Sequence, residues 1–285
     1  MEWTDRLNQA IHYIETHISE EIDYRDLAQI ACCSTYHFQR MFTYVAGISL
    51  SEYIRRRRMS LAAVDLQNGN ERILDIALKY GYASPTAFNR AFQGIHGIAP
   101  SALKNKGVSI KSYPPIAFAC TVSGRRELNY RVETKGPFRI VGKSYPLSRE
   151  IEKNFLEVPQ MWQSAGMDGT LKRILPLMEG PPRGVLGVSA CSGDEDWRYF
   201  IAVSSRMEID DSLEASSIPD CTWAIFPGKG TGKSIQELER RIVTEWLPTS
   251  GYEFAEGPDI EVYFEANPEH TQYEVWIPVM SDKGK

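Results

Sequence analysis

Long apolar segments are missing from the sequence. No stretch approaches the roughly 18 consecutive apolar residues that a membrane-spanning helix needs. The first five residues also lack the basic start and apolar run of a signal peptide. We therefore expect no spanning helix and no signal peptide, and we predict a cytoplasmic protein without a membrane partner.

Cysteine is scarce and scattered. The five cysteines have no Cys-x-x-Cys spacing and no histidines clustered near them, which fits a reducing compartment. We expect no zinc site or other metal site, and no cofactor. The adjacent Cys32 and Cys33 suit either a thiol sensor or two small residues packed beside a helix, and the second interpretation is favoured.

A large excess of basic charge is also missing, because the net charge is −5. The charge is uneven, however. Residues 1–106 carry 12 basic and 11 acidic residues, whereas the remainder carries 20 and 26. Phosphates respond to a local basic surface rather than to the total charge.

At about 100 to 200 residues per domain, 285 residues predict two domains, or at most three.

The first third of the chain has the period of helices. In residues 3–18 apolar residues recur at spacings of three and four, which predicts a helix with one buried face. Asp23 is a suitable N-cap for a second helix, which ends at residues 32–33. Ser34 caps a third helix over residues 35–45.

The second and third helices form the helix-turn-helix pattern that reads a DNA major groove. The third helix exposes polar side chains near its N-terminus, while its apolar side faces inward. Taken alone, this pattern is equally typical of a plain helical bundle. The outward residues are Tyr36, Gln39 and Arg40.

Repetition favours DNA binding. A long helix over residues 51–67 leads to a short helix over 73–80, and another helix follows over 84–96. Two such motifs joined by one helix place two recognition helices about 34 Å apart, so a monomer would read two adjacent major-groove segments. The outward residues of the last helix are Thr86, Asn89 and Arg90.

Four successive arginines, residues 55–58, lie in the long connecting helix. At about 100° per residue they cannot share one face, so only one or two can reach a phosphate while others pair with acids such as Glu52. A solvated face is the usual explanation of such a run. Its place between two candidate recognition helices favours a phosphate contact, which we assign to Arg57.

Two sets of residues carry a known signature. The first set is Leu27-Ala28, Ala31, Ser34, His37-Phe38, Arg40, Phe42, Gly47, Tyr53-Ile54, Arg57-Arg58-Met59 and Ala62; the second is Ile76-Ala77, Gly81-Tyr82, Phe88, Arg90, Phe92, Gly97 and Pro100. Together they resemble the DNA-binding domain of AraC/XylS-family regulators, and residues 36–42 are most similar to its Rob-like members.

The resemblance implies promoter DNA and RNA polymerase as partners, with Tyr36, Gln39, Arg40, Thr86, Asn89 and Arg90 as base-reading candidates. Two departures from the family pattern, Pro85 and residues 103–104, suggest that the second motif reads a different or weaker sequence.

After residue 106 the period changes to that of strands, and we place a domain boundary between residues 106 and 107. The predicted fold is therefore an all-α double helix-turn-helix domain, residues 1–106, followed by an α+β domain, residues 107–285. The second domain reads as two strand-helix-strand-strand repeats. Their strands are predicted at 130–145, 184–191, 197–205, 221–227, 259–265 and 273–279, with helices at 148–164, broken near its end by Pro159, and 234–246.

Strand parity suggests what the second domain presents to a ligand. If the aliphatic side of each of the last two strands meets a helix, Glu261 and Tyr263 share the opposite face with Glu274 and Trp276. Acids among aromatic rings would select an amphiphilic cation. On periodicity alone, glutamates that simply face solvent are equally probable.

The segments 260–263 and 273–279, with the doubled order of elements, resemble gyrase-inhibitor-like (GyrI-like) effector-binding domains. That resemblance implies a pocket for lipophilic, often cationic compounds. The candidates are Glu261, Glu274, Trp223, Tyr263 and Trp276, followed by Tyr145, Trp162 and Tyr199, for which core packing is favoured.

The sequence thus predicts a bacterial transcription regulator, an activator by family resemblance, that binds a lipophilic effector in a multidrug or stress response. An alternative is a hydrolase acting on lipophilic electrophiles, with Glu261 and Tyr263 as general base and acid. No nucleophile-base-orienter triad is visible, so we expect no enzyme and no catalytic residue. A protein inhibitor of another enzyme is a weaker alternative, because it leaves the two helix-turn-helix motifs without a role.

Overall fold

The computed structural model describes residues 3–69, 71–104, 107–118, 127–192, 196–264 and 271–281. The chain divides into two compact units. The first comprises residues 1–31 and 46–119, and the second residues 32–45 and 120–285. The predicted boundary between residues 106 and 107 stays a prediction, because residues 105–106 lie outside the described part.

The helices of the first unit begin and end where the sequence supplies caps. The Asp23 carboxylate accepts a hydrogen bond from the backbone N–H of Arg25, and the Ser84 hydroxyl accepts one from that of Ala87. Gly69 closes one helix with a φ of 72° in the left-handed region that favours glycine. The elements are α1 Trp3–Thr16, α2 Tyr24–Ile30, α4 Leu50–Asn68, α5 Ile73–Lys79, α6 Pro85–His96 and the 3₁₀ helix η1 Pro100–Lys104.

The core of the first unit includes a cluster over α4, α5 and α6. Phe88 and Phe92 of α6 are fully buried against Met59 of α4 and Ile76 of α5. The α6 side chains at positions i and i+4 thus share the inward face, as the helical period predicts.

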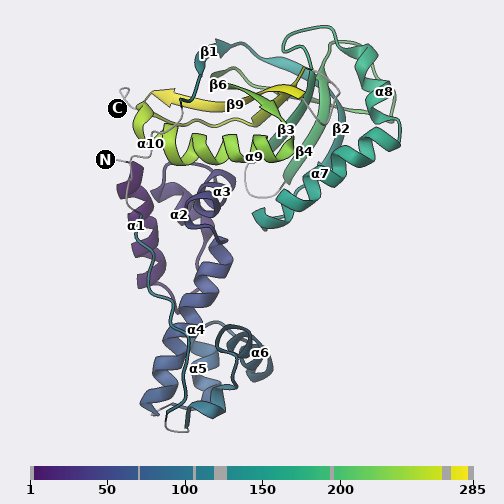
Figure 1. Ribbon diagram of the computed structural model, residues 1–285. Helices are drawn as coiled ribbons and strands as arrows, with labels where there is room; N and C mark the ends of the chain where they lie inside the picture. Colours follow the sequence, from purple (N-terminus) through teal and green to yellow (C-terminus); the bar gives the residue numbers. More distant parts are fainter. Residues whose placement is uncertain are drawn as a thin grey trace. The chain divides into compact units, whose positions relative to one another are not determined.

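The second unit combines helices with a nine-stranded antiparallel sheet, whose main path is β1-β6-β9-β8-β3-β4-β2-β5, with β7 paired to β9 (Figure 1). Its helices are α3 Thr35–Ala46, α7 Ile151–Met167, α8 Thr170–Ile174, α9 Gly232–Arg241 and α10 Leu247–Ser250, with the 3₁₀ turn η2 Leu175–Leu177 and the π-helical turn η3 Ile242–Trp246. Its strands are β1 Arg131–Lys135, β2 Phe138–Pro146, β3 Val185–Ser192, β4 Asp196–Ser204, β5 Glu214–Ile218, β6 Cys221–Gly230, β7 Tyr252–Phe254, β8 Asp259–Tyr263 and β9 Thr271–Ser281.

Both faces of this sheet are apolar. One face carries Val141, Ile201 and Val203, which pack with side chains of α7 and α8. The other carries Leu186, Val188, Ile225 and others in a separate buried cluster. Helices α7 and α9 cover the same face. Trp162 of α7 contacts Tyr199 and Tyr263. Tyr263 pairs across the strands with Tyr273, which donates a hydrogen bond to Ser234 of α9.

The expected order of regions, first all-α and then α+β, is confirmed. Strands β5 and β7 and helix α8 were not expected. The predicted break at Pro159 is wrong, because α7 continues through Pro159 to Met167; proline removes one backbone donor, and the remaining turns keep the helix intact. Among the described residues, no helix is long and apolar enough to cross a membrane.

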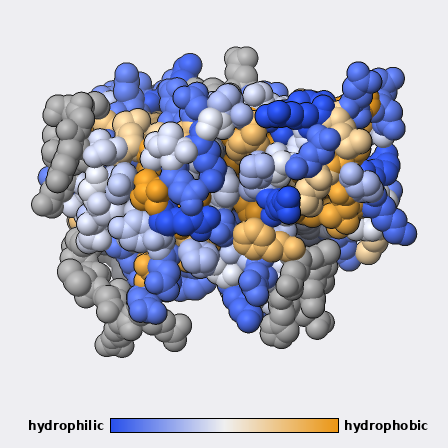
Figure 2. Space-filling view, turned by 90° about the horizontal axis from the view of Figure 1, so that it is seen from above, coloured by the Kyte–Doolittle hydropathy of each residue, from blue (hydrophilic) through white to orange (hydrophobic). Residues whose placement is uncertain are grey.

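One surface of the molecule, seen from above in Figure 2, is mostly hydrophilic. Its hydrophobic residues form separate patches among polar ones. This face therefore offers no continuous apolar surface among the residues drawn in colour.

Candidate functional site

Helix α3 begins at a serine cap. The backbone N–H of His37 donates to the Ser34 hydroxyl at 3.2 Å, which satisfies one of the free donors at the helix N-terminus. All residues from Thr35 to Phe42 are buried. Since these eight residues cover every side of the helix, α3 is enclosed on all its faces along its first two turns.

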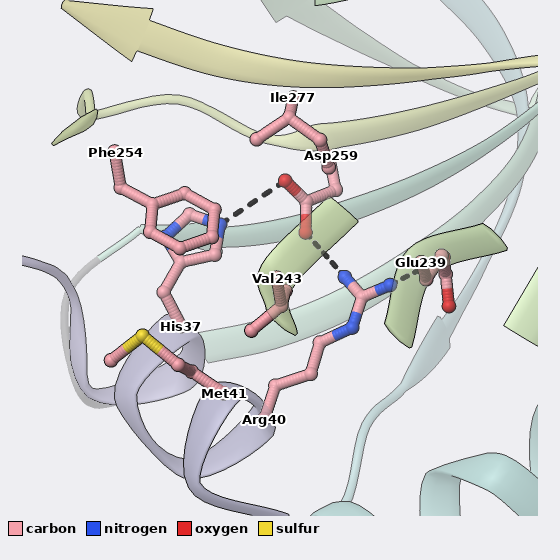
Figure 3. Close-up of a pocket in the computed structure, with 8 residues that line it drawn as sticks. All are labelled: His37, Arg40, Met41, Glu239, Val243, Phe254, Asp259 and Ile277. Atoms are coloured by element: carbon pink, nitrogen blue, oxygen red, sulfur yellow. Dashed lines mark hydrogen bonds and ion pairs between the residues drawn. The ribbon is translucent and has the colours of Figure 1, made fainter. Parts of the chain in front are cut away.

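Arg40 anchors α3 to the sheet unit. Its guanidinium forms an ion pair with Asp259 of β8 through Nη1 and another with Glu239 of α9 through Nη2 (Figure 3). The three residues are 7%, 5% and 6% exposed. The rings of Tyr36 and Tyr44, one helical turn before and after, lie with centroids 5.8 and 5.7 Å from the Arg40 Cζ, within the range of cation–π attraction.

His37 makes a second contact with the same carboxylate. Its Nε2 lies 3.1 Å from Asp259 Oδ1, and its ring stacks on Phe254 with centroids 4.3 Å apart (Figure 3). Burial alone would raise the pKa of Asp259, but its electrostatic interactions and hydrogen bonds with His37 and Arg40 together outweigh burial and lower that pKa below its ordinary value. Burial lowers the pKa of Arg40, yet the interactions with Glu239, Tyr36, Tyr44 and Asp259 together outweigh burial and hold the pKa well above its usual range.

Tyr36 inserts into the core on the helix-covered face of the sheet. Its hydroxyl donates to Ser189 Oγ at 3.2 Å, and its ring meets Trp197 edge to face at 5.2 Å. Tyr44 completes the row, because its hydroxyl donates to Glu239 Oε2 at 2.8 Å. The positions 36, 40 and 44 share one face of α3, and this face lies against α9, β3 and β8.

The structure therefore differs from the expectation that Tyr36, Gln39 and Arg40 point outward. All three are buried, and Tyr36 and Arg40 contact side chains more than 150 residues away in the sequence. In α6 the corresponding expectation holds: Thr86 and Arg90 are exposed and Asn89 is half-buried. The base-reading role of all six residues stays a prediction.

Arg57 is also not exposed. Its guanidinium pairs with Glu15 at 2.7 Å and donates to the Tyr113 carbonyl at 2.5 Å, so it holds α4 to α1 and to the segment after η1. Arg55 and Arg56 pair with Glu52, as expected for part of the run. A phosphate contact by Arg57 stays a prediction, and in this structure the guanidinium is already engaged.

Glu261 lies in a polar and aromatic cluster on the helix-covered face. Its Oε2 accepts hydrogen bonds from the hydroxyls of Tyr199, at 2.9 Å, and Tyr263, at 2.7 Å. Trp162 donates from Nε1 to the Tyr199 hydroxyl at 2.9 Å, and its ring meets Tyr263 edge to face at 4.7 Å. Gly187 opposite Glu261 makes the room, since a Cβ there would lie 2.1 Å from the Tyr199 hydroxyl oxygen and 2.8 Å from Glu261 Oε2.

The cluster has an unusual protonation balance. Burial raises the pKa of Glu261 to about 7, and the negative charge of Glu239 adds to the rise, while the hydrogen bonds from Tyr263 and Tyr199 oppose it. Burial, followed by the charge of Glu261, raises the pKa of Tyr263 well above its ordinary value. The Tyr263 hydroxyl therefore keeps its proton and serves as a hydrogen-bond donor to Glu261.

Tyr145 joins the Glu261 side of the sheet. It pairs directly with Tyr199 across β2 and β4, so both side chains share a face. The Lys143 ammonium lies 5.3 Å from the Tyr145 ring centroid. The Tyr145 hydroxyl is buried and has no hydrogen-bond partner among the residues that the structure describes.

The expectation that Glu274 and Trp276 share a face with Glu261 is wrong. The register of β8 and β9 pairs Val262 with Glu274 and Glu261 with Val275, so Glu261 and Glu274 point to opposite faces. Trp276 and the fully buried Trp223 pack in the other apolar cluster. Glu274 pairs with Arg131 at 2.7 Å and accepts from Trp276 Nε1 at 2.8 Å.

The reason for this error is that both faces of the sheet are apolar. The aliphatic side of β8, Ile260 and Val262, packs in the cluster away from the helices, so an aliphatic side does not mark the face that helices cover. Three of the five leading candidates, Glu274, Trp223 and Trp276, therefore lie outside the Glu261 cluster. The three weaker candidates, Tyr145, Trp162 and Tyr199, lie in it or beside it.

Sequence reasoning missed Glu239, Asp259 and His37. Glu239 carried a signal, because it falls on the apolar stripe of its helix, four residues after Ile235 and three before Ile242. Asp259 is an acid at the first position of a buried strand. Among the described residues, no group of three or more His, Cys, Asp and Glu residues is arranged to hold a metal ion.

Comparison with known families agrees with this architecture. Residues 131–279 match the family of integron-associated effector binding proteins, and residues 27–106 match a helix-turn-helix domain family. Because the first match covers more than half of the chain, the chain belongs to that effector-binding family. With its AraC-type helix-turn-helix region, the protein is a DNA-binding transcription regulator that carries an effector-binding domain.

Individual relatives cover different parts of the chain. The chain is 26% identical to Transcriptional regulator Rob of Salmonella typhimurium over 269 residues, 90% of each chain. It is 36% identical to the Bacillus subtilis regulator YbfP over 104 residues, which make up 35% of that protein's length and 36% of this chain. A solved structure of SAV2435 bound to tetraphenylphosphonium matches with a TM-score of 0.47 and 18% identity, covering 54% of this chain and 94% of the other.

Proposed function

We propose that the protein regulates promoters in response to a lipophilic cation bound at Glu261. The helix-turn-helix region would bind double-stranded promoter DNA and act with RNA polymerase as an activator, by family resemblance. Such a regulator works beside the chromosome, which in a bacterium is the cytoplasm. The observation that carries the ligand class is the Glu261 carboxylate, which is bound by Tyr199 and Tyr263 and flanked by Trp162.

Electrostatics favours a cation at this cluster. A buried carboxylate with a pKa near 7 is destabilised in its charged form, so a positive charge beside it recovers free energy that the free protein lacks. The rings of Trp162 and Tyr263 would add about 0.5 to 2 kcal/mol of cation–π attraction each. The unpartnered hydroxyl of Tyr145 offers a hydrogen bond to a polar group of the ligand.

The DNA contacts proposed for the second motif are Thr86, Asn89 and Arg90, because α6 presents them outward. Those proposed for the first motif are Tyr36, Gln39 and Arg40, which require α3 to leave its buried position. We also propose that the two halves of the sheet unit, β1–β4 with α7 and β5–β9 with α9, derive from one repeated strand-helix-strand-strand pattern.

The test is calorimetric titration of the full-length protein with tetraphenylphosphonium and with neutral triphenylphosphine oxide. We expect Glu261→Gln to weaken binding of the cation about 10- to 100-fold, or about 1.4 to 2.8 kcal/mol, and to change binding of the neutral compound much less. Glu274→Gln is the matched control, since Glu274 lies on the opposite face of the same sheet. Equal losses for both compounds in Glu261→Gln would mean that the acid is structural.

The pH dependence gives a second readout in the same titration. Because the pKa of Glu261 is about 7 in the free protein, a cation that binds the carboxylate releases a proton below that pH. Affinity should therefore fall by about tenfold per pH unit below pH 7 and level off above it. Glu261→Gln should abolish this slope, whereas a slope that persists in the variant would assign it to another group.

A further inference from the structure

Asp259 and Glu239 form a site for one guanidinium group. Each carboxylate binds a different nitrogen of Arg40, and both are almost fully buried. Two buried carboxylates that share one cation repel each other once the cation leaves. The site therefore demands a positive charge, and a planar group with two outward nitrogens satisfies both acids at once.

This site continues the Glu261 cluster. Asp259 and Glu261 are two residues apart in β8 and lie on the same face of the sheet, so their backbone positions are about 6.6 Å apart. In β3, Ser189 lies opposite Asp259, and Gly187, which has no side chain, lies opposite Glu261. Asp259, Glu261 and Tyr263 thus form one row beneath α7 and α9.

The face of α3 that occupies this region has the chemistry of the proposed effector. Tyr36, Arg40 and Tyr44 present a cation between two aromatic rings. Tyr36 is inserted beside Trp197 and Ser189, and Tyr44 beside Phe155 of α7 and Glu239 of α9. Helix α3 thus places an amphiphilic cation of the protein's own against Asp259 and Glu239.

We propose that the Asp259–Glu239 pair is a binding site for amidinium or guanidinium groups, that Arg40 occupies it when no effector is present, and that an effector cation displaces Arg40 and frees α3 for DNA. The proposal rests on the function proposed above. Arg40 cannot contact a base edge while both ends of its guanidinium are bound, so docking and DNA reading by α3 exclude each other.

The coupling follows from this exclusion. Effector binding at the Asp259–Glu239 pair and DNA binding by α3 both require the undocked helix, so each ligand raises the affinity for the other. The docked state lowers the apparent affinity of both in proportion to its population.

The first experiment measures amide hydrogen exchange of residues 35–46 by mass spectrometry in the full-length chain. We expect exchange in this segment to be about tenfold or more faster in Asp259→Asn and in Glu239→Gln, which corresponds to about 1.4 kcal/mol or more. Glu237→Gln is the control, because Glu237 lies on the same helix and its ion pair with Arg240 is at the surface. Equal exchange in all four proteins would overturn the proposal.

The second experiment uses the unaltered protein, so it does not depend on the folding of any variant. Benzamidine is added as an amidinium probe and benzamide as its neutral counterpart. We expect benzamidine to accelerate exchange in residues 35–46 with saturation, and Asp259→Asn to remove that response. No acceleration at saturating benzamidine, or the same acceleration with benzamide, would refute the guanidinium site.

DNA binding separates this proposal from the function on which it rests. With a duplex that the full-length protein selects from a random library, Asp259→Asn and benzamidine should each strengthen binding. If the protein binds DNA and tetraphenylphosphonium but neither change affects DNA affinity, release of α3 is refuted and the proposed function survives. If no variant binds DNA, the proposed function itself fails, while the exchange results still test whether α3 docks.

Discussion

Helices α3 and α6 are built on the same pattern and lie in opposite environments. At a constant offset of 50 residues the two helices share their serine caps, two phenylalanines and an arginine: Ser34 and Ser84, Phe38 and Phe88, Phe42 and Phe92, Arg40 and Arg90. The α3 arginine is buried between two carboxylates, whereas the α6 arginine is exposed. The pattern therefore fixes which side of each helix faces its own core, but it does not fix what covers the other side.

The differences between the helices lie at the positions that dock. Where α3 has His37, Met41 and Tyr44, α6 has alanine, alanine and glycine. His37 binds Asp259, Met41 lines the same pocket and Tyr44 binds Glu239. These three docking side chains have no counterpart in α6, whereas the docking arginine, Arg40, does.

The largest effect that separates the helices should come from the two arginines. Arg40→Ala leaves Asp259 and Glu239 as buried carboxylates without their shared cation, which should cost about 3 to 5 kcal/mol of unfolding free energy. Arg90→Ala changes an exposed residue and should stay within about 0.5 kcal/mol. Tryptophan fluorescence in urea follows the second unit, which holds Arg40 and five of the six tryptophans, and far-ultraviolet circular dichroism follows the helices of the first unit, which holds Arg90. Similar midpoints for the two variants would contradict the docking of α3.

The second-largest effect should be on DNA affinity, and here the α6 arginine rather than the α3 arginine should matter. Arg90→Ala should weaken binding to the selected duplex by about 1 to 3 kcal/mol and remove protection from one major-groove segment. Gln93→Ala is the control, since Gln93 is exposed on the same helix and is not a predicted base reader. An unchanged footprint in Arg90→Ala would remove α6 from the DNA interface.

The smallest effect tests a single hydrogen bond. Tyr44→Phe keeps the ring beside Phe155 and removes only the hydroxyl that donates to Glu239. We expect a loss of about 0.5 to 1.5 kcal/mol in the same urea titration. Tyr44→Ala, which also removes the ring as in α6, should lose more. If both variants match the unaltered protein, Tyr44 contributes nothing to docking.

Local signals in the sequence predicted most of the helices and strands. Asp23, Ser34 and Ser84 all act as caps, and the helix predicted over residues 51–67 is observed as Leu50–Asn68. These features depend on neighbours within a few residues, and the sequence displays such neighbours directly. The same holds for the exposure of Thr86 and Arg90, which nothing in the described part of the chain covers.

The candidate site was predictable only in part, because it depends on distant pairing. Strand parity placed Glu261 and Tyr263 correctly on one face, but the strand register that separates Glu274 from them is set by both apolar faces of the sheet. The burial of Arg40 depends on Asp259, 219 residues away. The contact between Arg40 and Asp259 is a tertiary contact, and the periodicity of the sequence does not encode such contacts.

Because the Arg40 ion pairs are buried, the docked state of α3 should respond to salt differently from the DNA contacts proposed for this helix. Contacts to DNA phosphates weaken steeply as ionic strength rises, because bound counterions are released on association. Mobile ions barely screen a pair whose three side chains are more than 90% inaccessible. If α3 reads DNA as proposed, rising ionic strength would leave the docked helix in place while it weakens DNA binding, so the protein would bind promoter DNA most tightly at low ionic strength.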